Sequence, residues 1–279
     1  MIRPVWTKPY GTLEGVKSLG EEMHTFDTLH IEVSGPVGTM RLNRPDRLNA
    51  LSRQTLRDLA DAAMWWNNQR EVKVVVVAGA GSSFSAGFDL GDFASRDPEV
   101  TPRDSADLGR IMAESVTGMN ALTIAAIQGH CVGGGVVLAA SCDLRIAAHN
   151  ALFRIPEVDL GIPLAWGGIP RLVRELGPAV TKELVLTCRA FGAEEAHALR
   201  FINTVVDHSE LDAHVYALAT SLASKPGYAL RTTKQQVNAV TEEMIGTGRS
   251  AADADALVFA TSDPESRAAS AAYLASKKK

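Results

Sequence analysis

The sequence predicts an α/β fold in which strands alternate with helices and a mainly helical region follows. A β-branched run at 72–77 that ends in glycines is typical of a strand covered on both faces. Segments with apolar residues at helical spacing lie on either side of it, and beyond about residue 170 this spacing dominates. With 46% hydrophobic and 22% charged residues, the 279-residue chain has the composition of a folded protein.

The first half of the chain alternates strands and helices in order. Residues 28–42 alternate between apolar and polar and break at Gly35-Pro36, which predicts a hairpin. Ser52 is a suitable N-cap for a helix over 53–68, and the buried strand at 72–77 follows. The alternation continues with a helix at 105–119, a strand at 123–128, a helix at 134–142 and a strand at 143–147.

The second half is predicted to be helical. Helical spacing recurs at 194–199, 211–224 and 228–240. Residues 251–279 are rich in alanine, serine and charge, which indicates a surface or interface helix. No stretch is linker-like enough to divide the chain on composition alone.

Charge and cysteine usage exclude several classes of protein. The chain has 28 Lys+Arg and 32 Asp+Glu, so its net charge of −4 gives no broad field for nucleic acid or an anionic membrane. Cys131, Cys142 and Cys188 have neither disulfide nor metal-ligand spacing. The first 20 residues have no apolar signal region, and charges interrupt the apolar stretch 132–148. We expect a cytoplasmic protein with no metal, nucleic-acid or membrane partner.

Two loops of small residues follow predicted strands. Phe84-Ser85-Ala86-Gly87-Phe88-Asp89-Leu90 follows the valine strand, and Gly129-His130-Cys131-Val132-Gly133-Gly134-Gly135 opens a predicted helix. Free backbone N–H groups and the positive end of a helix dipole hold anionic oxygens. The spacings match neither the phosphate loop nor the dinucleotide fingerprint. Tight helix packing around the glycines is the alternative interpretation.

A third segment places one carboxylate among apolar residues. Glu157 lies inside the proline-bracketed stretch from Phe153 to Pro163. Burial there would lift its pKa toward neutrality and make it a usable base. A surface carboxylate at the start of a helix is the alternative.

These three segments resemble the crotonase, or enoyl-CoA hydratase/isomerase, superfamily in order and spacing. Asn43-Arg44-Pro45-Asp46-Arg47-Leu48-Asn49-Ala50-Leu51 and Ser262-Asp263-Pro264-Glu265 extend the resemblance, which covers about Phe26 to the C-terminus. It implies a crotonase-like spiral of repeated ββα units over 26–200 with an acyl-CoA site, and a helical trimerisation region over 201–279. Residues 1–25 lie outside it as an N-terminal extension, and a homotrimer or hexamer is expected.

The same resemblance implies roles for individual residues. Ser85 and Gly134 match the positions whose backbone N–H groups form an oxyanion hole around the thioester carbonyl, and Glu157 matches the catalytic acid/base. Coenzyme A is then part of the substrate, and no separate cofactor is expected. The residues expected to contact CoA or the acyl group are Arg47, Leu48, Ala50, Ala86, Asp89, Leu90, Gly133, Pro156 and Trp166.

The resemblance also bears on the reaction. Family hydratases generally use two glutamates, and here Val137 occupies the position of the first. One base can abstract and return a proton, so Glu157 alone favours double-bond isomerisation. Hydration of a 2-enoyl-CoA to a 3-hydroxyacyl-CoA is the alternative. An alternative of another class is a non-catalytic CoA-binding or assembly subunit.

Several side chains have two interpretations. Trp166 lines the acyl pocket or packs beneath the glycine loop. Asp159 is a second polar group of the pocket or a surface residue, while Ala165 stands where other branches carry an aspartate. Lys234 is a weaker CoA candidate than Arg47, with an exposed helix lysine as the alternative. His130 is a structural histidine or a proton carrier.

Overall fold

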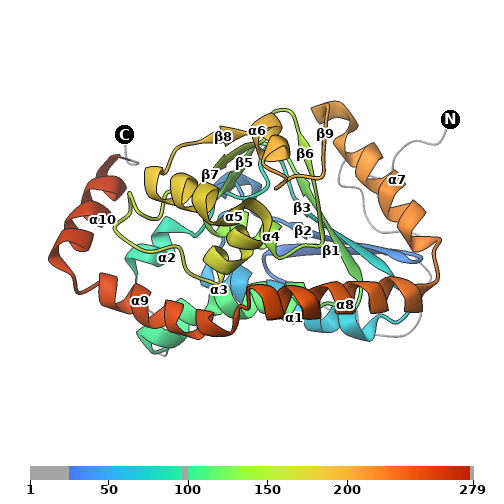
Figure 1. The fold of residues 1–279 in the computed structure, drawn as a ribbon, viewed down its shortest axis with the longest axis horizontal. Coiled ribbons are helices and arrows are strands. Elements are labelled where there is room, and N and C mark those ends of the chain that lie inside the picture. Colours follow the sequence, from blue (N-terminus) through green and yellow to red (C-terminus); the bar gives the residue numbers. More distant parts are fainter. Residues whose placement is uncertain (1–24, 96–99, 277–279) are drawn as a thin grey trace.

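The computed structural model describes residues 25–95 and 100–276 (Figure 1). The predicted N-terminal extension, 1–25, therefore lies outside the described residues except for Thr25. A six-stranded sheet with the strand order β1-β2-β3-β4-β6-β9 forms the centre of the molecule. The strands are β1 (Leu29–Ser34), β2 (Val37–Leu42), β3 (Val74–Gly79), β4 (Leu122–Ile127), β6 (Leu144–Ala148) and β9 (Thr204–Val206).

The first two strands form the predicted antiparallel hairpin, and every later pair in the main sheet is parallel. A smaller sheet contains β5 (His130–Val132), β7 (Leu152–Arg154) and β8 (Phe191–Gly192), in that order. Because β5 follows β4 directly and leads into a helix, the glycine loop lies where the two sheets meet.

Helices surround both sheets (Figure 1). Ser52 caps the first long helix as predicted, since its Oγ accepts a hydrogen bond from the Thr55 N–H at 3.1 Å. The helices are α1 (Arg53–Asn68), α2 (Leu90–Ala94), α3 (Pro102–Thr117), α4 (Gly134–Ala140), α5 (Gly168–Thr187), α6 (Ala193–Ala198), α7 (Leu211–Ala223), α8 (Gly227–Met244), α9 (Asp253–Ala260) and α10 (Pro264–Ser276), with short 3-10 turns at Pro45–Arg47, His208–Glu210 and Gly248–Ala252.

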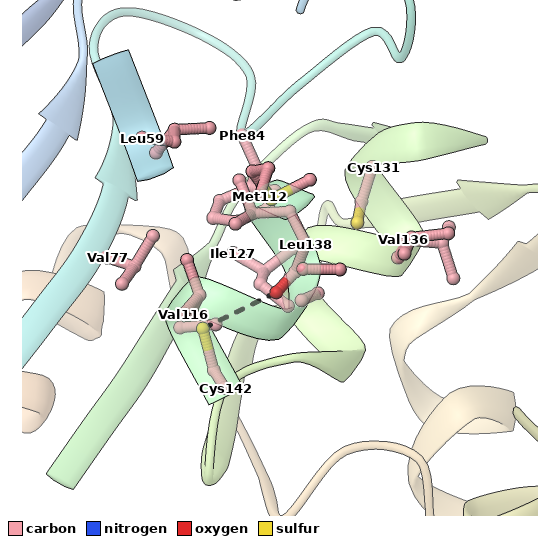
Figure 2. Close-up of a cluster of buried hydrophobic side chains, with 14 of the residues drawn as sticks. Leu59, Val77, Phe84, Met112, Val116, Ile127, Cys131, Val136, Leu138 and Cys142 are labelled. Carbon is pink, nitrogen blue, oxygen red and sulfur yellow. Dashed lines mark hydrogen bonds between the residues drawn. The ribbon is translucent and has the colours of Figure 1, made fainter. Parts of the chain in front are cut away.

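Strand β3 of the main sheet is buried on both faces, as the valine run predicts. Alternate residues of β3 point to opposite sides. Val75 and Val77 join a core with α1, α3 and α4, and Figure 2 shows Val77 together with Met112 and Leu138 in this cluster. Val74 and Val76 face α7 on the other side.

Most predicted elements occur within about three residues of their expected bounds, and the buried strand runs over Val74–Gly79 rather than 72–77. The C-terminal segment contains two helices, α9 and α10, instead of one. The boundary at residue 201 does not coincide with the end of the sheet. β9 lies beyond it and pairs with β6, and a three-residue strand leaves no periodicity to detect.

Among the described residues, no helix is both long and apolar enough to cross a bilayer.

Candidate active site

A largely apolar cavity of about 170 Å³ lies where the glycine loop, the Glu157 segment and two helices distant in sequence converge. Concave apolar pockets with a few convergent polar groups are the usual sites of small-molecule chemistry. Side chains of α3 and α9 form the wall opposite the loops. The described residues that line it are Arg53, Phe88, Phe93, Pro102, Ser105, Ala106, Gly134, Val137, Glu157, Ile162, Pro163, Leu164, Ala165, Trp166, Leu257, Val258 and Thr261.

Glu157 places its carboxylate against the glycine loop. A Cβ atom on Gly133 would collide with Glu157 Oε1, so the glycine is needed for this approach. Oε2 is buried and has no hydrogen-bond partner among the described residues. Burial raises the pKa of Glu157 to about 7, and a backbone hydrogen bond offsets only part of this. A carboxyl group with this pKa accepts and donates a proton near neutral pH.

The glycine loop presents a free N–H group to the cavity. Gly133 has φ +50° and donates its own N–H to the Arg154 carbonyl at 2.8 Å, which fixes the turn into α4. Gly134 is the first residue of α4 and lines the cavity, and its N–H has no partner among the described residues. First-turn N–H groups of helices are open to an external acceptor. Gly134 and Glu157 thus line the same cavity, as the sequence predicts.

The prediction for Ser85 as the other oxyanion donor is wrong. Its N–H already donates to the His130 carbonyl at 2.9 Å, because Ser85 pairs with Cys131 in a parallel bridge. Its hydroxyl donates to the Asn49 carbonyl at 2.9 Å, and the side chain is fully buried. Ser85 therefore supports the loop and has no donor left for a ligand.

Phe88, three residues further on, has the geometry that Ser85 lacks. It lines the cavity, and its backbone N–H has no hydrogen-bond partner within the described part of the chain. The neighbouring Gly87 has φ +89°, and a Cβ atom there would lie 3.7 Å from the Gly134 nitrogen. The loop therefore brings the Phe88 and Gly134 segments together. The sequence signal was the glycine preceding Phe88, which lets the chain turn toward the helix start.

Trp166 lines the cavity and packs on the glycine loop, so both interpretations of this residue hold. A Cβ atom on Gly134 or on Gly109 of α3 would collide with the indole, and the Phe88 ring meets it edge-on with centroids 5.7 Å apart. Trp166 has φ +62°, a left-handed conformation that costs a bulky residue roughly 1–2 kcal/mol. The neighbouring structure must hold it there.

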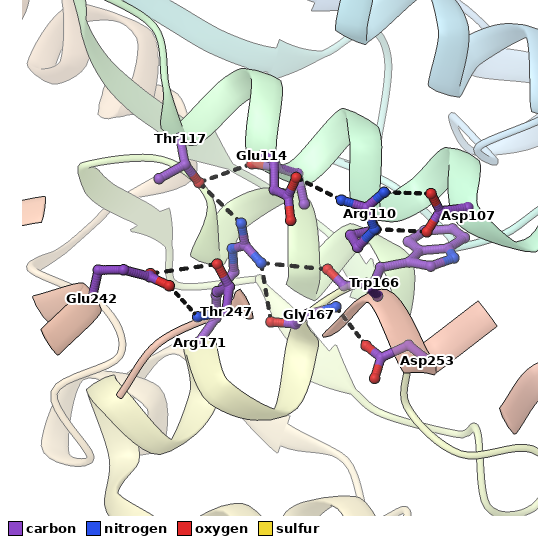
Figure 3. Close-up of polar contacts among 12 residues, drawn as sticks. Asp107, Arg110, Glu114, Thr117, Trp166, Gly167, Arg171, Glu242, Thr247 and Asp253 are labelled. Atoms are coloured by element: carbon purple, nitrogen blue, oxygen red, sulfur yellow. Dashed lines mark hydrogen bonds and ion pairs between the residues drawn. The ribbon is translucent and has the colours of Figure 1, made fainter. Parts of the chain in front are cut away.

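A buried polar network supplies that support (Figure 3). Asp253 of α9 accepts a hydrogen bond from the Gly167 N–H at 2.8 Å. Arg171 donates Nη1 to the carbonyls of Trp166 and Gly167 at 3.4 and 3.1 Å. Burial lowers the pKa of Arg171 to about 10, and the nearby Arg174 charge adds to this. The C-terminal helix α9 thus fixes the turn that carries Trp166.

The segment predicted to run along CoA lies beside the Phe88 loop. Ala86 donates its N–H to the Leu48 carbonyl at 2.9 Å. The Ala50 carbonyl accepts Arg44 Nη1 at 2.5 Å, and Arg44 Nη2 pairs with Asp89 at 2.8 Å. Although burial alone raises the pKa of Asp89, its hydrogen bonds with Arg44 and the Gly91 N–H lower it below the usual value. Asp89 therefore stabilises the segment 48–50 through Arg44.

Several predicted contacts lie outside the acyl cavity. Arg47 and Leu48 are exposed, Leu90 begins α2, and Gly133 and Pro156 are buried next to Glu157. None of them lines the cavity, so their contacts with CoA stay predictions.

The remaining candidate residues lie in the cavity wall, on the surface or in the protein interior. Val137 and Ala165 line the cavity and are apolar, so neither position supplies a second carboxylate. Asp159 is an exposed residue paired with Arg154 at 2.7 Å, and His130 is exposed. Both interpretations of Lys234 are wrong, because it is buried and its Nζ lies 2.8 Å from Asp143 and donates to the Ala121 carbonyl.

Within the described residues, no group of three or more His, Cys, Asp or Glu side chains is placed to hold a metal ion. Sequence reasoning missed Phe88, Arg53, the α9 residues Leu257 and Val258, and Thr261 just after α9, which reach the cavity through tertiary packing.

Comparison with known proteins agrees with this fold. The enoyl-CoA hydratase/isomerase family matches residues 32–279. Crotonyl-CoA hydratase of Syntrophomonas wolfei is 35% identical over 85% of this chain and 92% of its own. Short-chain-enoyl-CoA hydratase of Clostridium acetobutylicum is 35% identical over 75% of this chain and 80% of its own. The crystal structure of an enoyl-CoA hydratase/carnitine racemase from Magnetospirillum magneticum gives a TM-score of 0.74 at 32% identity, covering 77% of this chain and 82% of that one.

The α/β fold is thus that of the crotonase superfamily. The chain belongs to the enoyl-CoA hydratase/isomerase family, which confirms the family predicted from its motifs.

Proposed function

We propose that this protein isomerises 3-enoyl-CoA to 2-enoyl-CoA through an enolate, with Glu157 as the sole acid/base. One observation carries the proposal: Glu157 is the only carboxylate among the described residues that line the cavity, and its pKa is about 7. Val137 and Ala165 leave the rest of the nearby wall apolar. One carboxyl group suffices for a proton shift, because the proton it takes is the proton it returns.

The backbone N–H groups of Phe88 and Gly134 are the proposed oxyanion donors. Both line the cavity and both lack a partner among the described residues. The thioester oxygen would accept from both when negative charge develops on it. In comparable sites one such donor contributes roughly 10²–10³ in kcat.

The proposed steps balance with one proton. Glu157 takes the proton from C2 of the 3-enoyl group, and the electron pair of that C–H bond delocalises through the dienolate onto the thioester oxygen. Collapse of the dienolate forms the C2–C3 double bond, and C4 receives the proton from Glu157. No water enters the product, and the carboxylate returns to its starting state.

Hydration of a 2-enoyl-CoA is the second candidate, and the names of the relatives favour it. The similar proteins from Syntrophomonas wolfei and Clostridium acetobutylicum are both named hydratases. Hydration requires a water to be deprotonated and a carbon to be protonated, which two carboxyl groups normally share. Here Glu157 would have to perform both steps alone.

The CoA portion is proposed to lie along residues 48–50 and 86–90, outside the acyl cavity, with Arg47 near its phosphates. Arg47 is exposed in a 3-10 turn at the start of this segment. Coenzyme A belongs to the substrate, and no separate cofactor is proposed. The protein is proposed to act in the cytoplasm, where its three buried, unpaired cysteines stay reduced.

We also propose assembly into a trimer or a dimer of trimers. Val237, Val240 and Met244 of α8 follow helical spacing and are 57%, 57% and 75% exposed, so one helix face carries uncovered apolar side chains. Light scattering of the purified protein measures its mass, and a monomer at micromolar concentration would contradict this assembly.

Two substrates in deuterated water test the function. Purified protein is incubated with 3-enoyl-CoA and, separately, 2-enoyl-CoA, and the products are followed by mass for wild type and Glu157→Gln. Conversion of the 3-enoyl substrate without addition of water supports isomerisation. Hydration of the 2-enoyl substrate supports the second candidate, and binding with neither conversion nor Glu157-dependent deuterium exchange indicates a non-catalytic CoA-binding subunit.

A further inference from the structure

Arg53 is an unexpected cation in the wall of the acyl cavity. Apart from Glu157, it is the only ionisable side chain among the described residues that line this otherwise apolar space. Its side chain is 15% exposed. A partly desolvated guanidinium beside an apolar ligand is costly, and it attracts any acceptor that the ligand carries.

The charge of Arg53 is held by neutral oxygens. Nε donates to Ser105 Oγ at 2.7 Å, and Nη2 donates to the carbonyls of Asp92 and Ser95, both at 2.7 Å. Among the described residues, the carboxylate oxygen that pairs with the guanidinium is Asp92 Oδ1, which lies 4.0 Å from Nη1. These contacts fix the guanidinium while leaving its charge without a short ion pair among the described residues.

Nη1 retains donor capacity. Its hydrogen-bond partner in the described part of the chain is Ser95 Oγ at 3.3 Å, and a guanidinium Nη carries two N–H groups. At least one N–H of Nη1 therefore has no acceptor among residues 25–95 and 100–276.

Arg53 lies away from the reacting end of the cavity. Gly109 of α3 contacts Trp166, which in turn covers Gly134. Ser105, the partner of Arg53, precedes Gly109 by one helical turn, a rise of roughly 5–6 Å. The cation is thus anchored about one turn of α3 away from the helix position that contacts Trp166.

The size of the cavity limits the acyl group. At about 170 Å³ it is similar to an engineered cavity of roughly 150 Å³ that binds benzene, so about six heavy atoms fit beyond the thioester carbonyl.

Building on the function proposed above, we propose that the preferred substrate carries a carboxylate at the far end of a short acyl chain, and that Arg53 is the specificity-determining residue that binds it. A six-carbon enedioyl monothioester is compatible with this volume. Its free carboxylate meets Nη1 of Arg53 while C2 reaches Glu157.

Three substrates of equal length test this preference: 3-hexenedioyl-CoA, its terminal amide and 3-hexenoyl-CoA. Because a hydrogen bond to a charged group is stronger than a neutral one, wild-type kcat/KM is expected to be roughly 10- to 100-fold higher for the carboxylate than for either neutral substrate. Equal kcat/KM for all three would overturn the proposal, with no variant needed.

Variants of Arg53 test whether this residue causes the preference for the carboxylate substrate. Arg53→Gln is expected to abolish the difference between the carboxylate and the amide, and Arg53→Lys to retain part of it. Arg47→Gln is the matched control, since an effect on CoA lowers kcat/KM for all three substrates equally. A carboxylate preference that survives in Arg53→Gln would overturn the assignment.

The outcomes separate the two proposals. If the neutral substrates isomerise as well as the carboxylate, the substrate class is wrong and the proposed function stands. If none of the three substrates is converted to its 2-enoyl isomer, the proposed function itself fails.

Discussion

The carboxylate of Glu157 lies directly against the α-carbon of Gly133, and there is no room between them for a methyl group. The proposed base is therefore in direct contact with the glycine loop that carries the proposed oxyanion donor Gly134. Any change in the backbone of the loop moves the two groups relative to each other.

Gly133→Ala tests whether activity depends on this contact. The new Cβ would displace Oε1 of Glu157, and a displacement of about 1 Å is sufficient to lower kcat roughly 100-fold. Because Gly133 has φ +50° and ψ −114°, outside the left-handed helical region, the alanine also costs about 1–3 kcal/mol of stability through backbone strain.

Gly35→Ala is the matched control for that measurement. Gly35 has φ +58°, and a Cβ atom added there would meet nothing within 4 Å, so this position experiences the strain without the collision. Urea unfolding should show a loss for both variants that is larger for Gly133→Ala, where the collision adds to the strain, whereas only Gly133→Ala loses activity. Equal kcat for both would contradict the proposed contact.

The pH dependence of activity should report Glu157. Its pKa is about 7, and only the carboxylate form abstracts a proton, so kcat/KM should rise as pH increases through about 7 and level off above it. The measurement is kcat/KM for a 3-enoyl-CoA from pH 5.5 to 9. A rising limb centred near pH 4.5 would mean that burial does not perturb this group.

Stability should change with pH in the opposite sense. Glu157 stays protonated in the folded protein up to about pH 7, while the unfolded chain loses that proton near pH 4.5. Between these values the folded state binds more protons, so the free energy of unfolding falls with rising pH, by about 3 kcal/mol in total. Glu157→Gln removes this penalty, and its stability advantage over wild type should grow by about 2 kcal/mol between pH 5.5 and 8.

Glu183→Gln is a control for that series. Glu183 is exposed, and its hydrogen bond with Arg189 lowers its pKa, so it stays ionised throughout the range. Its stability difference from wild type should not vary from pH 5.5 to 8. Urea unfolding at four pH values measures both variants.

Gly134 and Trp166 should behave as a coupled pair. A Cβ on Gly134 would collide with the indole, so Gly134→Ala should cost about 1–3 kcal/mol of stability and most of the activity. In a Trp166→Leu background the same substitution should cost at least about 1 kcal/mol less, because the smaller side chain leaves room. Strictly additive unfolding free energies in the four proteins of this cycle would show that the ring does not press on the loop.

The sequence was informative where periodicity or a motif is local. The valine run predicted a doubly buried strand, and the segments around Gly134 and Glu157 predicted two groups that the structure brings to one cavity. The Ser85 error has a physical cause. Its bridge to Cys131 consumes the N–H, and register between distant strands is not visible in one sequence.

Long-range packing accounts for the other differences. Lys234 has helical spacing and a charge, which favours a surface position, yet Asp143 pairs with it in the interior. The α9 residues Leu257 and Val258 lie far along the chain from the motifs and still line the cavity. Neither contact leaves a local signature, because each depends on where α8 and α9 dock.

Asp253 should control substrate binding through the turn that holds Trp166. Its carboxylate accepts the Gly167 N–H at 2.8 Å, next to the left-handed Trp166. Asp253→Ala leaves that buried donor unpaired, which should cost about 1–3 kcal/mol of stability and raise KM more than it lowers kcat, since Trp166 forms the acyl wall. Asp253→Asn keeps an acceptor oxygen and should recover most of both. Asp255→Ala in the same helix loses only an exposed pair with Arg103, which is worth at most about 1 kcal/mol, and should leave KM unchanged. An unchanged KM in Asp253→Ala would show that the turn holds Trp166 without help from α9.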